Sequence, residues 1–315
     1  MRNNILIDLL EYLRHTDIFK FILPIIDEYV RYTFKNNEEL KKAVNEWCND
    51  RDFAFIKYGD ISLWITQFIT DMSELFLYEK NFNDNIVYWD TRNVKDMSLM
   101  FCNCHKFNQP LNWDTSNVTD MVSMFAISTS FNQPLNWDTC NVTDMSNMFK
   151  DAELFNQPLN FNAKNVTDMN GMFNSAVSFN QQINFTRASK VINMDNMFCN
   201  AKKLNNIINF NTSNITSMIA MFEKASSFNQ PLNFNTRNVI NMDDMFHNAT
   251  SFNQPLNWDT QNVESMDSMF YHASSFNQLL NFDMSNVTNI NRMFIGTCIE
   301  PELIDTSILF EQSDY

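Results

Sequence analysis

Hydrophobic and polar positions along this chain follow two different rhythms within each of many similar segments. In one such segment, Leu135 and Trp137 alternate with polar neighbours at a period of two, which is the spacing of a β-strand. Met145, Met148 and Phe149 follow at i, i+3 and i+4, which is the spacing of one helix face. The pattern therefore predicts a short strand, a turn and a short helix in each segment.

The Met-x-x-Met-Phe signature of this segment recurs at steps of 24 or 25 residues. Its first position is occupied in turn by Met72, Met97, Met121, Met145, Met169, Met194, Met218, Met242, Met266 and Ile290. A fixed period of this length indicates one supersecondary unit per repeat, stacked into a solenoid. We call each repeat unit a coil.

Stacking places equivalent residues of successive coils above one another, so that columns of residues become the unit of interpretation. Two aromatic columns are predicted to form the core, since large apolar groups at a fixed phase must face inward. One column contains Trp64, Trp89, Trp113, Trp137, Phe161, Phe185, Phe210, Phe234, Trp258 and Phe282. The other contains Phe76, Phe101, Phe125, Phe149, Phe173, Phe198, Phe222, Phe246, Phe270 and Phe294.

A third column is polar and consists of asparagines that precede a buried Val or Ile. Its members are Asn93, Asn117, Asn141, Asn165, Asn214, Asn238, Asn262 and Asn286. A short amide side chain at a turn can hydrogen-bond the backbone of its own coil and the side chain of the next coil, so we interpret the column as a structural ladder. Five of its members also form Asn-x-Thr sequons, including Asn141-Val142-Thr143, and we interpret these as by-products of the repeat.

Two further repeated features predict where the helix and the strand of each segment begin. Thr143 or Asp144 stands where a helix N-cap belongs, because its side-chain oxygen can accept from amides of the first turn. Pro134 and its equivalents remove a backbone donor, so they should mark either the first residue of a short strand or an unpaired position.

The string from Phe107 to Phe125, FNQPLNWDTSNVTDM followed two residues later by Met-Phe, resembles the BspA-like repeat family. The resemblance covers about residues 60–295. It implies an α/β fold: a right-handed, leucine-rich-repeat-like solenoid with a short parallel strand and a short helix per coil. It also implies binding to other proteins or cell surfaces, and it carries over no catalytic residue.

The chain is expected to divide into a helical N-terminal segment and cap (1–59), the solenoid of about ten coils (60–296), and a C-terminal cap or tail (297–315). Leu40, Ala43, Val44 and Trp47 share one helix face that could cover the first coil. A loose likeness to an F-box around Leu9 to Leu13 would instead imply an adaptor role for the N-terminal segment.

Composition and charge narrow the function. Only 3 of 315 residues are Gly, which argues against Gly-rich phosphate loops. The net charge is −15 and arises mainly after residue 60, so nucleic acid and anionic lipid are poor partners.

The chain shows no signal peptide or membrane-spanning run, and an intracellular location is expected. The six cysteines are expected to be unbridged thiols.

The sequence offers no catalytic or metal-binding constellation. His15, His105, His247 and His272 do not share a column. Asp90, Asp114, Asp138 and Asp259 do share one and could suggest calcium, but the column is interrupted by Asn162, Thr186, Asn211 and Asn235. We therefore expect neither an enzyme nor a cofactor. The predicted function is a protein-interaction module whose acidic face binds an unknown partner of basic character, with a structural or particle-surface or cell-surface repeat protein as the alternative.

Overall fold

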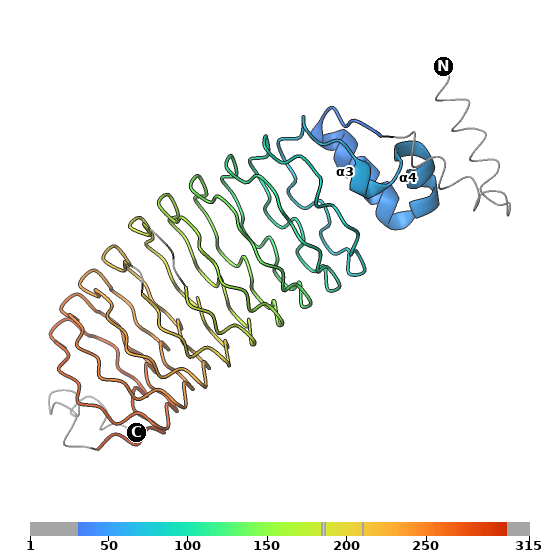
Figure 1. Ribbon diagram of the computed structural model, residues 1–315. Helices are drawn as coiled ribbons and strands as arrows, with labels where there is room; N and C mark the ends of the chain where they lie inside the picture. Colours follow the sequence, from blue (N-terminus) through green and yellow to red (C-terminus); the bar gives the residue numbers. More distant parts are fainter. Residues whose placement is uncertain (1–30, 184, 186, 210, 301–315) are drawn as a thin grey trace.

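A computed structural model describes residues 31–183, 185, 187–209 and 211–300 of the protein. Successive coils lie side by side along one axis, with helices α3 and α4 at the N-terminal end of the stack (Figure 1). The predicted N-terminal features in residues 1–30, the aromatic residue Phe210 and most of the predicted C-terminal tail lie outside the described residues.

Helix α3 spans Asn37–Asn49 and packs one face against the stack. Its N-cap is Asn36, whose side-chain oxygen accepts a 2.9 Å hydrogen bond from the Glu39 amide. Its buried residues are Leu40, Ala43, Val44 and Trp47, the four that share one face in the sequence pattern.

Helix α4 spans Arg51–Tyr58 and ends at Gly59, which has a φ of 74°. A single 3₁₀ turn, η1 (Ile61–Leu63), then leads into the first coil. No helix of the described residues is long and apolar enough to cross a membrane.

The predicted strand and helix in each coil are wrong. Among the described residues after η1, the chain forms turns and isolated parallel bridges, with no α-helix and no sheet. One series of bridges joins successive coils at Asp120, Asp144 and Asp168, and a shorter series joins Leu159, Ile183 and Ile208. The expected α/β, leucine-rich-repeat-like architecture is therefore not the architecture of this protein.

The segment predicted to be helical is interrupted by left-handed residues at every fourth position. In one coil these are Asn147 and Asp151, each with a φ of 56°. Equivalent residues in other coils include Leu99 and Ile127, although a positive φ is unfavourable for bulky side chains. A right-handed helix cannot continue through such positions, so the segment is a series of turns.

Hydrogen bonds to the next coil explain why this turn series forms. The amides of Met145, Asn147 and Phe149 donate to carbonyls of the following coil at 3.1, 2.8 and 2.9 Å. The Met148 amide instead closes a turn onto Met145 at 3.3 Å. Met145, Met148 and Phe149 are nevertheless fully buried, so the i, i+3, i+4 pattern identified inward-facing residues correctly but assigned them to the wrong backbone conformation.

The segment predicted to be a strand keeps the alternation but has almost no backbone ladder. Leu135 and Trp137 are buried, whereas Pro134 and Asn136 are exposed. Because the proline lacks an amide hydrogen, side chains supply much of the bonding between coils here. The Thr115 hydroxyl, for example, donates to the Asp138 carbonyl of the next coil at 2.8 Å.

Stacked Phe rings run through a core that also contains buried Met, Val, Leu and Trp side chains. Within a coil, the rings of Phe149 and Phe155 lie with their centroids 4.0 Å apart. Between coils, the Phe149 ring lies 5.6 Å from Phe125 and 5.6 Å from Phe173. The predicted column members Phe101, Phe125, Phe149, Phe173, Phe198, Phe222, Phe246 and Phe270 all have 0% exposure. Successive coils therefore share one continuous aromatic core.

The eight asparagines of the predicted ladder all make the same contact. Each side-chain nitrogen donates to a backbone carbonyl of the preceding coil, at 2.6 to 3.0 Å, for Asn93, Asn117, Asn141, Asn165, Asn214, Asn238, Asn262 and Asn286. These hydrogen bonds join each of the eight coils to the coil before it.

A second asparagine ladder was missed at the sequence level. The side-chain oxygen of Asn108 accepts from the Asn132 amide, and that of Asn132 accepts from the Asn156 amide, at 3.0 and 2.9 Å. The side chain of Gln157 donates to the same Asn132 oxygen at 3.1 Å. The signal was present in the recurring Phe-Asn-Gln tripeptide, which repeats with the same period as the Met signature.

Replacing Phe149 by Ala should lower the free energy of unfolding by about 3–5 kcal/mol, because the cavity left between three stacked rings cannot collapse. Leu154→Ala is the matched control, since Leu154 is 55% exposed. Urea denaturation of both variants measures the difference. Equal midpoints for the two variants would place Phe149 outside the core.

Replacing Asn141 by Ala should lower the free energy of unfolding by about 0.5–1.5 kcal/mol, the usual net contribution of one hydrogen bond. The lost contact is the 2.7 Å bond to the Ser116 carbonyl. Asn136→Ala serves as the control because the exposed Asn136 side chain has no hydrogen bond within the described residues. If the two variants are equally stable, the ladder contributes nothing measurable.

Candidate functional site

The most extended array of functional groups is a row of aspartates that runs along the stack, which we call the carboxylate line. Its first five members occupy the bridge position of consecutive coils, and the later ones lie two residues further along their coils. The members are Asp71, Asp96, Asp120, Asp144, Asp168, Asp195, Asp243 and Asp267. Each of these residues is half-buried.

Local backbone bonds fix the orientation of these carboxylates. One oxygen of Asp144 accepts from the Ser146 amide, two residues later, at 2.8 Å. This contact is an Asx turn, so the prediction that Asp144 caps a helix is wrong because no helix follows. The coil that carries Ser217 has no aspartate at this position, and its Ile219 amide donates instead to the Asp195 side chain of the preceding coil at 2.8 Å. The row of carboxylates is therefore interrupted by one coil between Asp195 and Asp243.

The carboxylates influence one another along the row. Burial raises the pKa of Asp120, and the neighbouring charges of Asp96 and Asp144 raise it further. Burial likewise raises the pKa of Asp168, with further contributions from Asp144 and Asp195. The line is therefore a concentrated negative field in which ionised neighbours repel one another.

Cations of the chain itself occupy both ends of the line. The Lys41 ammonium of α3 lies 3.2 Å from one oxygen of Asp71 and 3.2 Å from the Ser73 hydroxyl. Burial alone would raise the pKa of Asp71, but hydrogen bonds from Ser73 and Lys41 lower it. At the other end, the Arg292 guanidinium lies 3.3 Å from Asp267.

The interior of the line lacks such cations. In the part of the chain that the structure describes, no Lys, Arg or His forms an ion pair with Asp96, Asp120, Asp144, Asp168, Asp195 or Asp243. These carboxylates direct one oxygen to the backbone and leave charge available at the surface. The interior can therefore accept cationic groups from outside the chain.

The aspartate column that suggested calcium lies elsewhere on the coil. The Asp138 carboxylate accepts from the Cys140 amide at 3.0 Å, and Asp90 pairs with Arg92 at 2.9 Å. Within the described residues, no group of three or more His, Cys, Asp or Glu is arranged to hold a metal ion.

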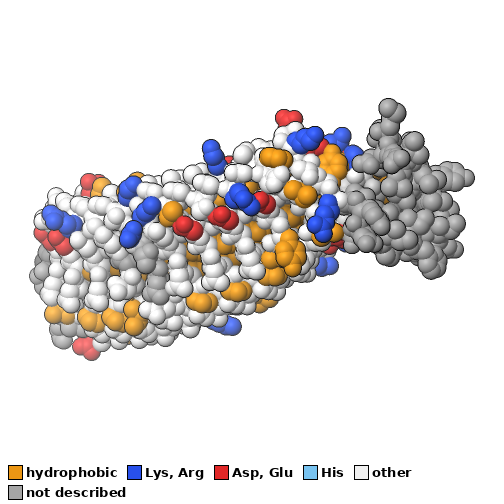
Figure 2. All heavy atoms as spheres, turned by 45° about the horizontal axis from the view of Figure 1, so that its top comes forward, with side chains coloured by type: hydrophobic (Ala, Val, Ile, Leu, Met, Phe, Trp, Pro, Cys, Tyr) orange, Lys and Arg blue, Asp and Glu red, His pale blue; other side chains and the backbone are white. Residues whose placement is uncertain are grey.

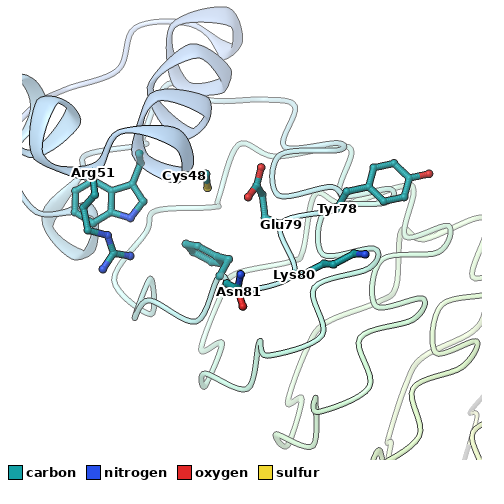
Figure 3. Close-up of a pocket in the computed structure, with 8 residues that line it drawn as sticks. Cys48, Arg51, Tyr78, Glu79, Lys80 and Asn81 are labelled. Carbon is teal, nitrogen blue, oxygen red and sulfur yellow. The ribbon is translucent and has the colours of Figure 1, made fainter.

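A cavity of about 370 Å³ lies between the helices and the first coils. Figure 3 shows the Glu79 carboxylate turned toward the Cys48 thiol, with the Tyr78 ring extending away. Burial raises the pKa of Cys48 to about 12, with added contributions from Glu79 and Asp84. Arg51 is held by Asp84 and lies 5.0 Å over the Trp47 ring. A thiol that stays protonated at neutral pH is a poor nucleophile.

Replacing both Asp120 and Asp168 by Asn should raise the free energy of unfolding at pH 7. Because both folded-state pKa values are raised, the stability these groups contribute is present when they are protonated and is lost as pH rises through the folded pKa. We expect the double variant to gain about 0.2–1 kcal/mol at pH 7, reduced by solvent screening. Asn already occupies this column at Asn193 and Asn241, where it accepts the same backbone bond.

Urea denaturation at pH 7 and at about pH 4, the ordinary Asp range, tests this. The advantage of the double variant should shrink at the lower pH, where the parent carboxylates are protonated. Asp114→Asn is the control, since hydrogen bonds from Ser116 lower the pKa of Asp114 and its loss should not stabilise. A double variant less stable than the parent at pH 7 would contradict the electrostatic interpretation.

Comparison with known proteins shows which family the chain belongs to. The family model described as "Mycoplasma protein of unknown function, DUF285" matches the chain three times in tandem, over residues 48–136, 135–210 and 205–300. Neither a curated protein nor a solved structure matches the chain. The three tandem matches establish a repeat family and extend over most of the chain, without establishing a leucine-rich-repeat motif. The chain therefore belongs to the DUF285 family.

Proposed function

We propose that this protein is a non-enzymatic interaction module whose carboxylate line binds a basic segment of another protein. The observation that carries the proposal is the occupation of the two ends of the line by Lys41 and Arg292, with unpaired carboxylates between them. The chain's own side chains thus provide examples of how an ammonium and a guanidinium approach this row.

The repeat gives the line a length that single acidic clusters lack. Coils that pair through backbone bonds lie about 4.8 Å apart, so the five consecutive aspartates from Asp71 to Asp168 extend over about 20 Å. Long Lys and Arg side chains can reach successive carboxylates from a partner segment that follows the stack axis. Such a site would recognise several spaced cations rather than one.

The raised pKa values are consistent with a binding role. Neighbouring carboxylates that repel one another reduce the stability of the free protein, and a cationic partner would relieve that repulsion. The same field repels phosphate backbones and anionic lipid, which supports a basic protein as the partner.

The thiols support the non-enzymatic part of the proposal. Burial raises the pKa of Cys199 to about 12, with Glu223 contributing, and burial also raises the pKa of Cys104. These thiols remain protonated near neutral pH and are weak nucleophiles. Cys199 lies 3.5 Å from Glu223, which further disfavours its thiolate.

Binding of a fluorescein-labelled eight-residue lysine peptide to the full chain tests the proposal by fluorescence anisotropy. We expect measurable binding at low ionic strength that weakens as salt approaches physiological concentration, where the Debye length is about 8 Å. The triple variant Asp120→Asn, Asp144→Asn, Asp168→Asn should weaken binding at least fivefold at low salt.

A variant of equal net charge provides the control. Asp90→Asn, Asp114→Asn and Asp138→Asn remove three carboxylates from another column, in which Asn162 and Asn235 already occur. This control should change binding less than twofold. Equal weakening by both variants would show that net charge alone attracts the peptide, and the absence of binding by the parent would favour a structural role.

A further inference from the structure

A second surface of the stack carries no charge at all. Eight five-residue segments, one per coil, contain no Asp, Glu, Lys, Arg or His, although 19% of the chain is Asp, Glu, Lys or Arg. The segments are residues 108–112, 132–136, 156–160, 180–184, 205–209, 229–233, 253–257 and 277–281. We call the outward side of these segments, within the described residues, the uncharged face.

Two exposed columns form the uncharged face. The first is mainly apolar and consists of Pro110, Pro134, Pro158, Gln182, Ile207, Pro231, Pro255 and Leu279. Ile207 and Leu279 are 53% and 54% exposed. Figure 2 shows a row of hydrophobic side chains along the lower edge of the stack, set apart from the charged side chains above it. Such an apolar row on a strongly acidic protein marks a surface suited to association.

The second column consists of asparagines two positions further along each coil, namely Asn112, Asn136, Asn160, Asn209, Asn233, Asn257 and Asn281. All are exposed, and none of their side chains makes a hydrogen bond within the described residues. They differ in this respect from both asparagine ladders, in which the amides join neighbouring coils. An amide carries both a donor and an acceptor, so this column can pair with an identical column.

We propose that the uncharged face associates with the same face of a second copy of this chain. A chain of net charge −15 repels its own copies. At this face, two copies can meet without bringing like charges into contact. With the two stacks antiparallel about a two-fold axis, the apolar columns face each other and the amide columns face each other. The equal rise per coil in both copies keeps these contacts in register.

The antiparallel arrangement also suits the ends of the molecule. The helices α3 and α4 lie at one end of the stack, so antiparallel copies place them at opposite ends of the pair (Figure 1).

Seven steps of about 4.8 Å give a face about 34 Å long. With two columns it would bury on the order of 400–500 Å² per copy, which is small for a stable interface and predicts a micromolar dimer.

This inference is independent of the proposed function, because salt should affect the dimer and the binding of a basic peptide in opposite directions. Acidic residues such as Asp138 and Asp259 border the uncharged face and would repel across the rim of the pair. Added salt screens that repulsion, so the dimer should become tighter, whereas binding of a basic peptide should become weaker. The two proposals can therefore fail separately.

Sedimentation velocity of the full chain at about 1–100 µM tests the inference, since this range brackets a weak dimer. We expect a monomer–dimer equilibrium whose dissociation constant falls at least twofold between 0.05 and 0.5 M salt. The variant Pro158→Glu, Pro231→Glu should raise the dissociation constant at least tenfold. The charge-neutral variant Ile207→Gln, Leu279→Gln should raise it at least threefold, and Gln182 shows that the column accepts Gln.

The control adds the same charge elsewhere. Ser116→Glu and Ser213→Glu lie in a column where other coils carry Arg92, Lys164 and Arg237, so a long side chain fits there. This control should leave the dissociation constant within twofold of the parent value. A parent that remains monomeric at 100 µM, or a dimer that both face variants leave unchanged, would overturn the inference.

Discussion

The structure depends on a hydrogen-bonding requirement that a single coil cannot meet. The amides of Met145, Asn147, Phe149 and Asp151 all donate to the following coil, over distances of 2.7 to 3.1 Å. Stacking supplies these acceptors and at the same time closes the Phe core. An isolated coil would leave polar backbone groups and apolar rings unpartnered, so neighbouring coils stabilise one another and the same residue types recur at each position.

Side chains complete the bonding where the backbone does not. Asn132 accepts from the next coil through its side chain, Asn141 donates to the preceding coil, and Thr115 donates to the following coil. These contacts account for the abundance of Asn and Thr at fixed positions. They also separate two kinds of exposed surface: columns committed to the stack, and columns such as that of Asn136 that remain available to partners.

Periodicity could predict which residues point inward but could not predict their backbone conformation. The buried positions of Met145, Met148 and Phe149 follow directly from the repeat. The Asn141 contact was predicted only in kind, because its side chain donates to a backbone carbonyl of the preceding coil and not to its own backbone or to a side chain of the next coil. The helix prediction failed because a series of turns produces the same i, i+3, i+4 pattern. The left-handed conformation of Asn147 and Asp151 has weak sequence signals, since Leu99 and Ile127 adopt it in other coils.

The carboxylate line escaped sequence analysis for a related reason. Asp144 and its equivalents directly precede the first Met of the signature, so the repeat places them in one column, but the helix-cap interpretation assigned them a local role and not a role along the axis. The change from Asp168 to Asp195 also moves the acid by two positions in the repeat, which breaks the column in an alignment but not in space. The line therefore depends on tertiary contacts between coils, which the spacing of one segment does not reveal.

The most direct test of this account is the backbone conformation of Asn147 and Asp151, measured by NMR on the isotopically labelled full chain. The account predicts a positive φ near 56° at both residues, together with hydrogen bonds from the amides of Asn147 and Phe149 to the next coil. A φ of about −60° throughout residues 145–152, with amides bonded four residues back, would show a helix and would contradict it.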